Sequence, residues 1–124
     1  MDERLPLLTM KDFLYDEFME PLGISAYKLA KDIHVPVSRI QDILHDRRKI
    51  SIDTSMRLGK YFGMHPLFFF RLQLDLDYRK AIRETEEELE TIEQINTDPN
   101  KFLNVTEKFQ SELDDIIPLS TEKW

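Results

Sequence analysis

The stretch from Pro36 to Leu44 carries residue types that suit the recognition of DNA bases. Apolar residues recur along it at helical spacing, which predicts a helix with one buried face. The opposite side offers five candidate base contacts: Val37, Ser38, Arg39, Gln41 and Asp42. Arginine grips guanine, glutamine grips adenine, aspartate accepts from cytosine, serine serves several edges, and valine meets the thymine methyl group. Asp42 is equally suited to pair with Arg39, and the sequence leaves both alternatives open.

Residues on either side of this helix have the chemistry of phosphate ligands. The start of the preceding helical pattern offers Ser25, Tyr27 and Lys28, where free backbone N–H groups would add to the attraction. After the helix come His45, Arg47, Arg48 and Lys49. A run of charges is ordinarily a solvated loop, and that interpretation stays open. The position of this run, directly after the candidate base-reading helix, favours phosphate contact.

Two short helices joined by a tight turn must position these side chains. The first pattern starts at Ser25, a favoured N-cap residue, and places small Ala30 beside its apolar face. Only His34 and Val35 separate it from the second pattern, so the helices must cross steeply and touch. We therefore predict a helix-turn-helix over residues 25–45. The alternative is any all-α domain with two adjacent short helices.

The turn needs a residue with a positive φ angle, a position that glycine usually holds. His34 stands there, and histidine is among the residues other than glycine that tolerate the left-handed region. We expect His34 to adopt this conformation with some strain.

The remaining patterns of the front part are also helical. We predict helices over about 10–20, 25–33 and 36–45, between Ser51 and Gly63, and over 66–83.

Residues 66–83 allow two interpretations. Alternation of polar and apolar residues from Arg71 to Tyr78 is typical of a strand, whereas a helix would carry two apolar stripes on nearly opposite sides. Pro66, at the start, favours the helix. One stripe, formed by Phe68, Leu72 and Leu76, can cover the core. The second stripe is Leu67, Phe70, Leu74, Tyr78 and Ala81.

The second stripe needs a partner, most simply another copy of the chain. We therefore predict a homodimer through it. The alternative is that Phe68–Phe70 all belong to the core of a monomer.

Charge divides the 124 residues, whose net charge is −7, into two parts. Residues 1–84 hold 14 Lys or Arg against 13 Asp or Glu, a net of +1, and residues 85–124 hold 3 against 11, a net of −8. This asymmetry suggests different partners for the two ends. We predict a helix-turn-helix domain for DNA binding and dimerisation over 1–84, followed by an acidic, helical extension over 85–124.

The acidic extension has an apolar stripe of its own. Weak spacing over residues 85–98 leaves open whether they continue the preceding helix. From about 99 to 117 the stripe recurs at helical spacing and consists of Phe102, Val105, Phe109, Leu113 and Ile116. A merely solubilising tail has no need of it, so we predict that it binds a protein with a basic surface. The alternative is that it packs on its own domain or on the dimer partner.

The sequence lacks the motifs of catalysis and of membrane insertion. There is no cysteine, no HExxH motif and no Gly-rich phosphate loop, and the three histidines stand in different contexts. No apolar run approaches the length of a membrane span, and the charged opening is unlike a signal peptide. We expect a cytoplasmic protein that is not an enzyme and takes no cofactor, metal or small-molecule substrate.

Several segments together carry a family resemblance: YDEFMEPLGIS, YKLAKDI, VPVSRI, RRKISIDTSMRLGKYFG and PLFFFRLQLDLDYRKA. Over roughly residues 11–83 the chain resembles the HigA-type antitoxins of the Xre/Cro-repressor helix-turn-helix family. The resemblance implies an all-α, five-helix, lambda-repressor-like domain that binds a palindromic operator in double-stranded DNA as a dimer. It also implies a toxin partner, a small ribonuclease that acts on mRNA.

The resemblance assigns roles to individual positions. Val37, Ser38, Arg39 and Gln41 fall where the family reads bases, and His45 and Arg48 fall near its phosphate contacts. The chain departs from the family at His34 and Asp46, where glycine is common.

Two functions remain open from the sequence. The first is a transcriptional repressor that is also an antitoxin, which neutralises an mRNA-cleaving toxin by direct binding and autoregulates its operon. The second is a stand-alone Xre-family regulator whose tail serves dimerisation or another protein partner. A neighbouring reading frame for a basic protein would favour the first function, and its absence would favour the second.

Overall fold

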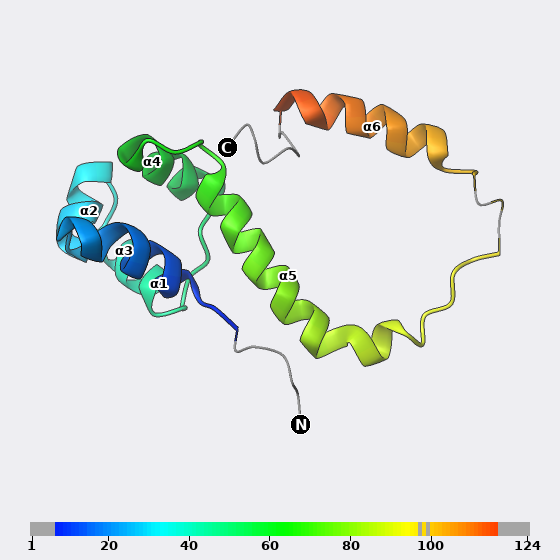
Figure 1. The fold of residues 1–124 in the computed structure, drawn as a ribbon, viewed down its shortest axis with the longest axis horizontal. Helices are drawn as coiled ribbons and strands as arrows, with labels where there is room; N and C mark the ends of the chain where they lie inside the picture. The colour runs from blue at the N-terminus through cyan, green and yellow to red at the C-terminus, as the bar shows by residue number, and fades with distance from the viewer. Residues whose placement is uncertain (1–6, 97, 99, 117–124) are drawn as a thin grey trace. The chain divides into compact units, whose positions relative to one another are not determined.

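The computed structural model describes residues 7–96, 98 and 100–116, without the side chains of residues 106 and 111–116. Within these residues the chain forms helices and no strand (Figure 1). The α-helices are α1 Met10–Phe13, α2 Ala26–Ile33, α3 Val37–Leu44, α4 Ile52–Phe62, α5 Phe68–Leu89 and α6 Leu103–Ile116. None of the described helices is long and apolar enough to cross a membrane. The all-α prediction is confirmed.

The chain divides into two compact units, Met1–Glu84 and Thr85–Trp124. The first unit holds α1 to α4 and most of α5, and the second holds the end of α5 together with α6.

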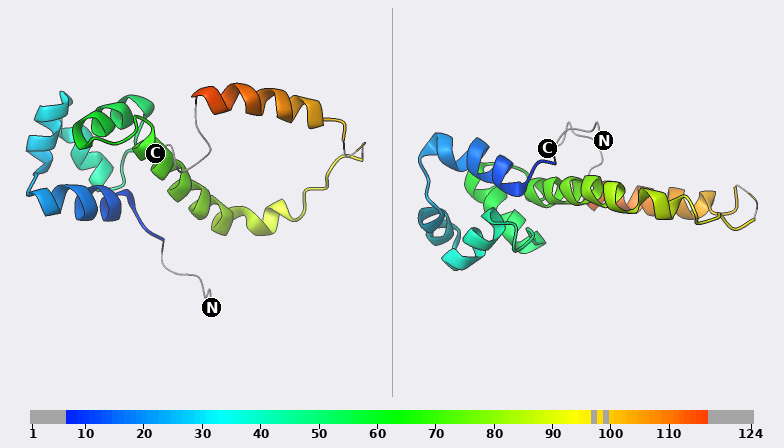
Figure 2. Two further views of the ribbon diagram at one scale, coloured as in Figure 1. Left: turned by 45° about the horizontal axis from the view of Figure 1, so that its top comes forward. Right: turned by 90° about the horizontal axis from the view of Figure 1, so that it is seen from below.

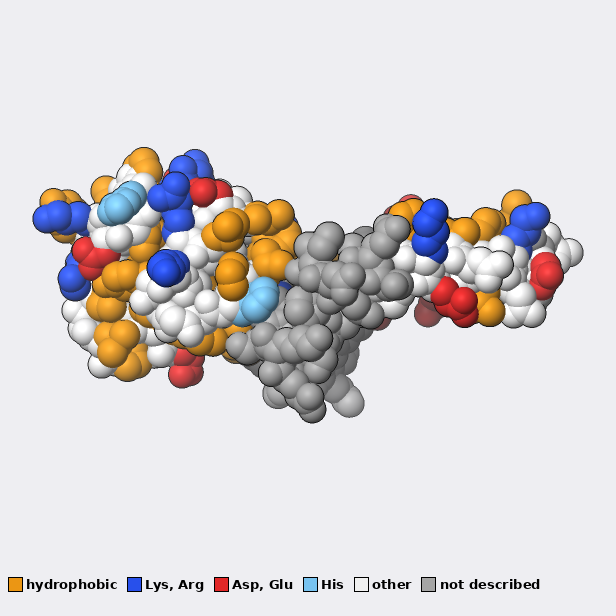
Figure 3. Space-filling model, turned by 90° about the horizontal axis from the view of Figure 1, so that it is seen from above, with side chains coloured by type: hydrophobic (Ala, Val, Ile, Leu, Met, Phe, Trp, Pro, Cys, Tyr) orange, Lys and Arg blue, Asp and Glu red, His pale blue; other side chains and the backbone are white. Residues whose placement is uncertain are grey.

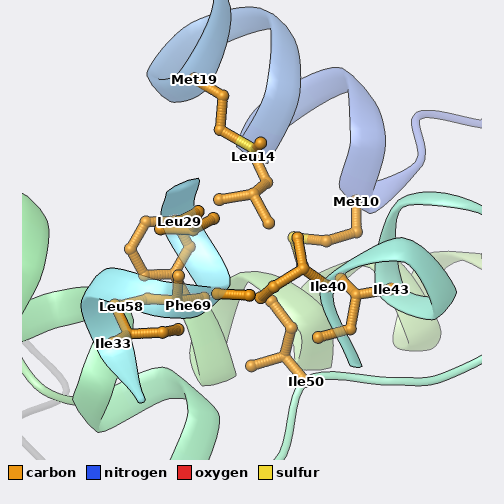
Figure 4. Close-up of a cluster of buried hydrophobic side chains, with 11 residues drawn as sticks. Met10, Leu14, Met19, Leu29, Ile33, Ile40, Ile43, Ile50, Leu58 and Phe69 are labelled. Atoms are coloured by element: carbon orange, nitrogen blue, oxygen red, sulfur yellow. The ribbon is translucent and has the colours of Figure 1, made fainter. Parts of the chain in front are cut away.

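One hydrophobic core joins the helices of the first unit, which cluster around the start of α5 (Figure 2). Phe69 is fully buried, and its ring centroid lies 5.0 Å from that of Phe18. Figure 4 shows Phe69 within one buried cluster that includes Leu29 of α2 and Leu58 of α4. The buried apolar residues are Met10, Leu14, Met19, Leu29, Ala30, Ile33, Ile40, Ile43, Ile50, Leu58 and Phe69. Because α1 to α5 all contribute, the fold of the helix-turn-helix depends on every one of them.

The segment before α2 is less regular than the single helix predicted over 10–20. Thr9 caps α1, accepting a hydrogen bond from the backbone N–H of Asp12. The chain then continues as a π-helix, Leu14–Met19, and a short 3₁₀-helix, Glu20–Leu22. Bonding between residues five apart brings Leu14 and Met19 to the same side, and both are fully buried. Packing has therefore overridden the regular helical period.

The helical interpretation of residues 66–83 is confirmed, and the alternative of a strand is wrong. α5 extends to Leu89, so the first residues of the acidic part do continue this helix. Its buried side is centred on Phe69 and Gln73, with Leu72 and Leu76 packed at its edge. The predicted core stripe missed Phe69, because three consecutive phenylalanines give no indication of which one points inward.

α4 and the segment that leads into α5 approach closely at Gly59. A Cβ atom at this position would lie 2.7 Å from the carbonyl oxygen of His65 and 3.1 Å from that of Met64. One turn earlier, the buried hydroxyl of Ser55 donates to the carbonyl of Pro66 and accepts from the N–H of Phe70, both at 2.8 Å. Position 59 therefore has no room for a Cβ atom and requires glycine.

Replacing Gly59 with alanine should lower the free energy of unfolding by about 1–3 kcal/mol, because the added methyl group displaces backbone atoms. Alanine alone would favour the helix by about 1 kcal/mol, so the sign of the change is informative. Denaturant titration measures it, and Lys60→Ala, at an exposed neighbouring position, should change little. A Gly59→Ala protein at least as stable as the original would refute the close approach.

Candidate nucleic-acid interface

The tight turn between α2 and α3 adopts the predicted geometry. Ser25 is the N-cap of α2, and its hydroxyl accepts from the backbone N–H of Lys28 at 3.1 Å. His34 ends the helix with φ 64° and ψ 48°, so its predicted left-handed conformation is confirmed. The N–H of Val35 donates to the carbonyl of Ala30 at 3.0 Å, and Pro36 is the N-cap of α3.

The strained turn has a support from α4 that the sequence reasoning missed. The Arg57 guanidinium donates to the carbonyl of Ile33 at 3.0 Å and lies 3.5 Å from that of His34. Its Nε is 3.1 Å from both carboxylate oxygens of Asp53, one helical turn earlier. A cation at carbonyl groups that end a helix is favourable. The four-residue spacing of Asp53 and Arg57 predicts that they pair, but it does not indicate that Arg57 also contacts the turn.

The five candidate base contacts of α3 differ in accessibility. Ser38 and Gln41 are exposed, and their side chains have no protein partner among the described residues. Val37 packs against the core. The Arg39 guanidinium lies 3.2 Å from Asp53, and the carboxylate of Asp42 lies 3.0 Å from Arg47. The pairing of Arg39 with Asp42, which the sequence left open, is therefore not the one found.

The loop after α3 is held at its start by Asp42. The carbonyl of Asp42 accepts from the N–H groups of Arg47 and Arg48 at 2.8 and 3.2 Å. Asp46 has φ 59°, so it is left-handed, as His34 is. Lys49 pairs with Asp77 at 3.0 Å. Among residues 47–49, all described, only Arg48 has an unpaired side chain.

His45, the remaining candidate of this loop, is exposed, and its Nδ1 lies 2.7 Å from the carbonyl of Gln41. Figure 3 shows Lys and Arg side chains spread among hydrophobic ones on one face of the first unit, rather than gathered in one basic patch.

The candidates at the start of α2 are partly engaged. Ser25 and Tyr27 are exposed, whereas Lys28 pairs with Asp32 at 2.9 Å. Asp32 also accepts from the Tyr61 hydroxyl at 2.7 Å. The hydrogen bond from Tyr61, followed by the one from Lys28, lowers the pKa of Asp32. The hydrogen bond to Asp32 raises the pKa of Lys28, which keeps this cation charged but paired.

The second stripe of α5 lies largely on the surface of the single chain. Leu74 and Tyr78 are 58% and 65% exposed, and Ala81 is also exposed. Leu67 and Phe70, nearer the start of the helix, are half-buried.

The apolar stripe of the acidic extension is partly described. Phe102, Val105 and Phe109 are exposed, and α6 begins at Leu103 rather than near residue 99. The side chains of Leu113 and Ile116 lie outside the described residues. No group of three His, Cys, Asp or Glu side chains able to hold a metal occurs in the described part of the chain.

Comparison with known proteins relates α2 to α4 to a known family. A family model described as helix-turn-helix matches residues 17–69. Virulence-associated protein I of Dichelobacter nodosus is 36% identical over 77 residues, which cover 62% of this chain and 71% of that protein.

Solved structures of antitoxin proteins are also similar to this chain. The antitoxin HigA of Pseudomonas aeruginosa, solved with the higBA promoter, matches with a TM-score of 0.68 and 28% identity, covering 73% of this chain and 100% of that one. An addiction module antidote protein of the HigA family from Coxiella burnetii matches with a TM-score of 0.68 and 29% identity, covering 74% and 100%.

Proposed function

Since the chain belongs to the Xre-type helix-turn-helix family, we propose that it represses transcription by binding an operator and serves as the antitoxin of a toxin–antitoxin pair. The observation that carries the proposal is the outward side of α3, where Ser38 and Gln41 stand exposed and unpaired beside a loop with the unpaired cation Arg48. The resemblance to HigA, solved with its promoter, supports it.

In the proposed complex α3 lies in the major groove of the DNA. Gln41 and Ser38 read base edges, since their side chains are accessible without breaking a protein contact. Arg39 also reads a base, once its guanidinium group has left Asp53. Val37 contacts a thymine methyl group through its exposed part. Asp42 is already bonded to Arg47, so it is better placed to hold the loop than to accept a hydrogen bond from cytosine.

Phosphate contacts surround this helix in the proposal. Arg48 is the principal one, because the other loop cations, Arg47 and Lys49, must first leave Asp42 and Asp77. His45 adds a contact from the end of α3. Ser25, Tyr27 and Lys28 contact phosphate from the start of α2, where backbone N–H groups and the helix dipole favour an anion.

A homodimer through the exposed stripe of α5 completes the DNA-binding unit. Leu74 and Tyr78 are large apolar side chains whose exposure has no benefit in a monomer. A two-fold axis there would present two α3 helices about 34 Å apart, one turn of DNA, to a palindromic operator.

The acidic extension is the proposed toxin-binding part. Phe102, Val105 and Phe109 form an exposed apolar stripe within a segment of net charge −8. A ribonuclease that cleaves mRNA must be basic to hold its substrate, so the charge complementarity would orient and speed its capture. By binding the toxin, the protein would neutralise it. By binding the operator of the operon that encodes both proteins, it would regulate its own transcription.

The base-reading and phosphate roles differ in their response to mutation. Gln41→Ala should weaken binding to the operator by about 1–3 kcal/mol and relax the preference at one base pair. Arg48→Ala should weaken binding to every duplex alike. It should also lower the number of counterions released on binding by about one, which appears as a shallower salt dependence of the affinity. Fluorescence anisotropy with operator and scrambled duplexes, over a range of salt, measures both. Identical behaviour of the two variants on both duplexes would contradict the proposed roles.

The dimer is tested by placing charge on its proposed interface. Leu74→Glu combined with Tyr78→Glu should give folded monomers with much weaker operator binding, because two buried carboxylates would oppose association. Arg79→Glu, an exposed neighbour outside the stripe, is the matched control and should stay dimeric. Sedimentation analysis measures the mass. An unmodified protein that stays monomeric at high concentration would exclude this interface.

The extension is tested by ending the chain after Leu89, where α5 ends. The shortened protein should keep dimerisation and operator binding and lose most of its affinity for a basic ribonuclease encoded beside it. Within the full chain, Phe109→Ser should reproduce that loss, and Lys108→Ala should not. Unchanged neutralisation by the shortened protein would place the toxin site elsewhere in the chain, and collapse of the dimer would favour a structural role. No neutralisation by the full chain would favour a stand-alone regulator.

A further inference from the structure

A buried glutamine on α5 holds the loop that carries Arg48. Gln73 is only 7% exposed, and its Oε1 accepts from the backbone N–H of Ile50 at 3.2 Å. Ile50, itself buried, is two residues from Arg48 and comes just before α4. A buried N–H requires a partner, so the position of the loop end is set by a side chain of α5.

A second contact extends this link to the neighbouring loop residue. The Nε2 of Gln73 donates to Oδ1 of Asp77, one helical turn along α5, at 3.1 Å. The other oxygen of Asp77 lies 3.0 Å from the ammonium group of Lys49. Gln73 therefore satisfies Ile50 and orients the carboxylate that holds Lys49, so two consecutive loop residues are fixed to one helix.

The loop is thus anchored at both of its ends. Its start is held by the carbonyl of Asp42, which accepts from Arg47 and Arg48, and its end is held by Gln73 and Asp77. Between the loop and α5 lies an open cleft of about 350 Å³, lined in part by residues 46–49 and by Leu76. Across this cleft the polar link of Gln73 and Asp77 fixes the distance between loop and helix.

We propose that Gln73, assisted by Asp77, is a positioning residue that fixes the loop so that Arg48 meets a DNA phosphate. The inference rests on the proposed function, because it adds a residue remote from the DNA to that interface. It also ties operator binding to α5, since Gln73 and Asp77 directly precede Leu74 and Tyr78 of the exposed stripe. Whatever partner covers that stripe acts on the same helix that holds the loop.

A double-mutant cycle in the full chain tests the proposal. Gln73→Met keeps the size of the side chain and removes both of its hydrogen bonds. If Gln73 acts through Arg48, the substitution should weaken operator binding about three- to tenfold in the original protein and less than twofold in an Arg48→Ala background. A merely structural loss would weaken both backgrounds equally, and equal effects would overturn the proposal.

Two controls keep the test decisive. Leu14→Val, a core substitution on the π-helix, should lower stability while leaving operator affinity unchanged. If Gln73→Met does not fold, the cycle is run with Asp77→Asn, a half-buried position, in a Lys49→Ala background, so that no ammonium group is released to bind phosphate. Additivity with Arg48→Ala would then contradict the proposal.

Amide hydrogen exchange separates failure of the inference from failure of the proposed function. Absence of operator binding by the original protein would refute the function alone. Faster exchange at the N–H of Ile50 and Arg48 in Gln73→Met, with α2 unchanged, would still support positioning of the loop. Unchanged exchange at both sites would overturn it.

Discussion

The crossing of α2 and α3 is the constraint on which the rest of the structure depends. Ala30 is buried at this crossing, and the turn leaves so little chain that His34 must adopt a left-handed conformation. A larger residue at position 30 would separate the helices and misdirect the exposed side of α3. The strain at His34 is offset by Arg57, whose guanidinium binds the carbonyl groups of the turn. Core, turn and candidate interface therefore depend on one packing contact.

Ion pairing decides which cations of the first unit are available to DNA. Asp53, Asp42 and Asp77 pair with Arg39, Arg47 and Lys49, and the unit as a whole is nearly neutral. A surface of this kind attracts any duplex weakly, since non-specific binding depends on unpaired positive charge. In the proposed function, recognition of an operator then relies on the geometry of a few side chains.

Local patterns in the sequence predicted most of the fold. The N-caps at Ser25 and Ser51, the C-cap at Gly63 and the left-handed His34 follow from residue type and spacing, and all are found. The π-helix, the burial of Phe69 and the pairing of Asp42 with Arg47 did not follow. Each depends on contacts between segments distant in sequence or on a choice among equivalent neighbours, and periodicity carries no information on either.

The candidate site was predictable in outline only. That α3 presents a polar side follows from the burial of Ile40 and Ile43, but which polar residues stay unpaired depends on Asp53 of α4 and Asp77 of α5. NMR titration of the ¹⁵N-labelled protein with a duplex from upstream of its own gene tests the central claim most directly. The expected result is shifts concentrated at Ser38, Gln41 and Arg48, with Ser38 and Gln41 unmoved by a scrambled duplex. Equal shifts with both duplexes, or shifts confined to α5 and α6, would contradict recognition of DNA by α3.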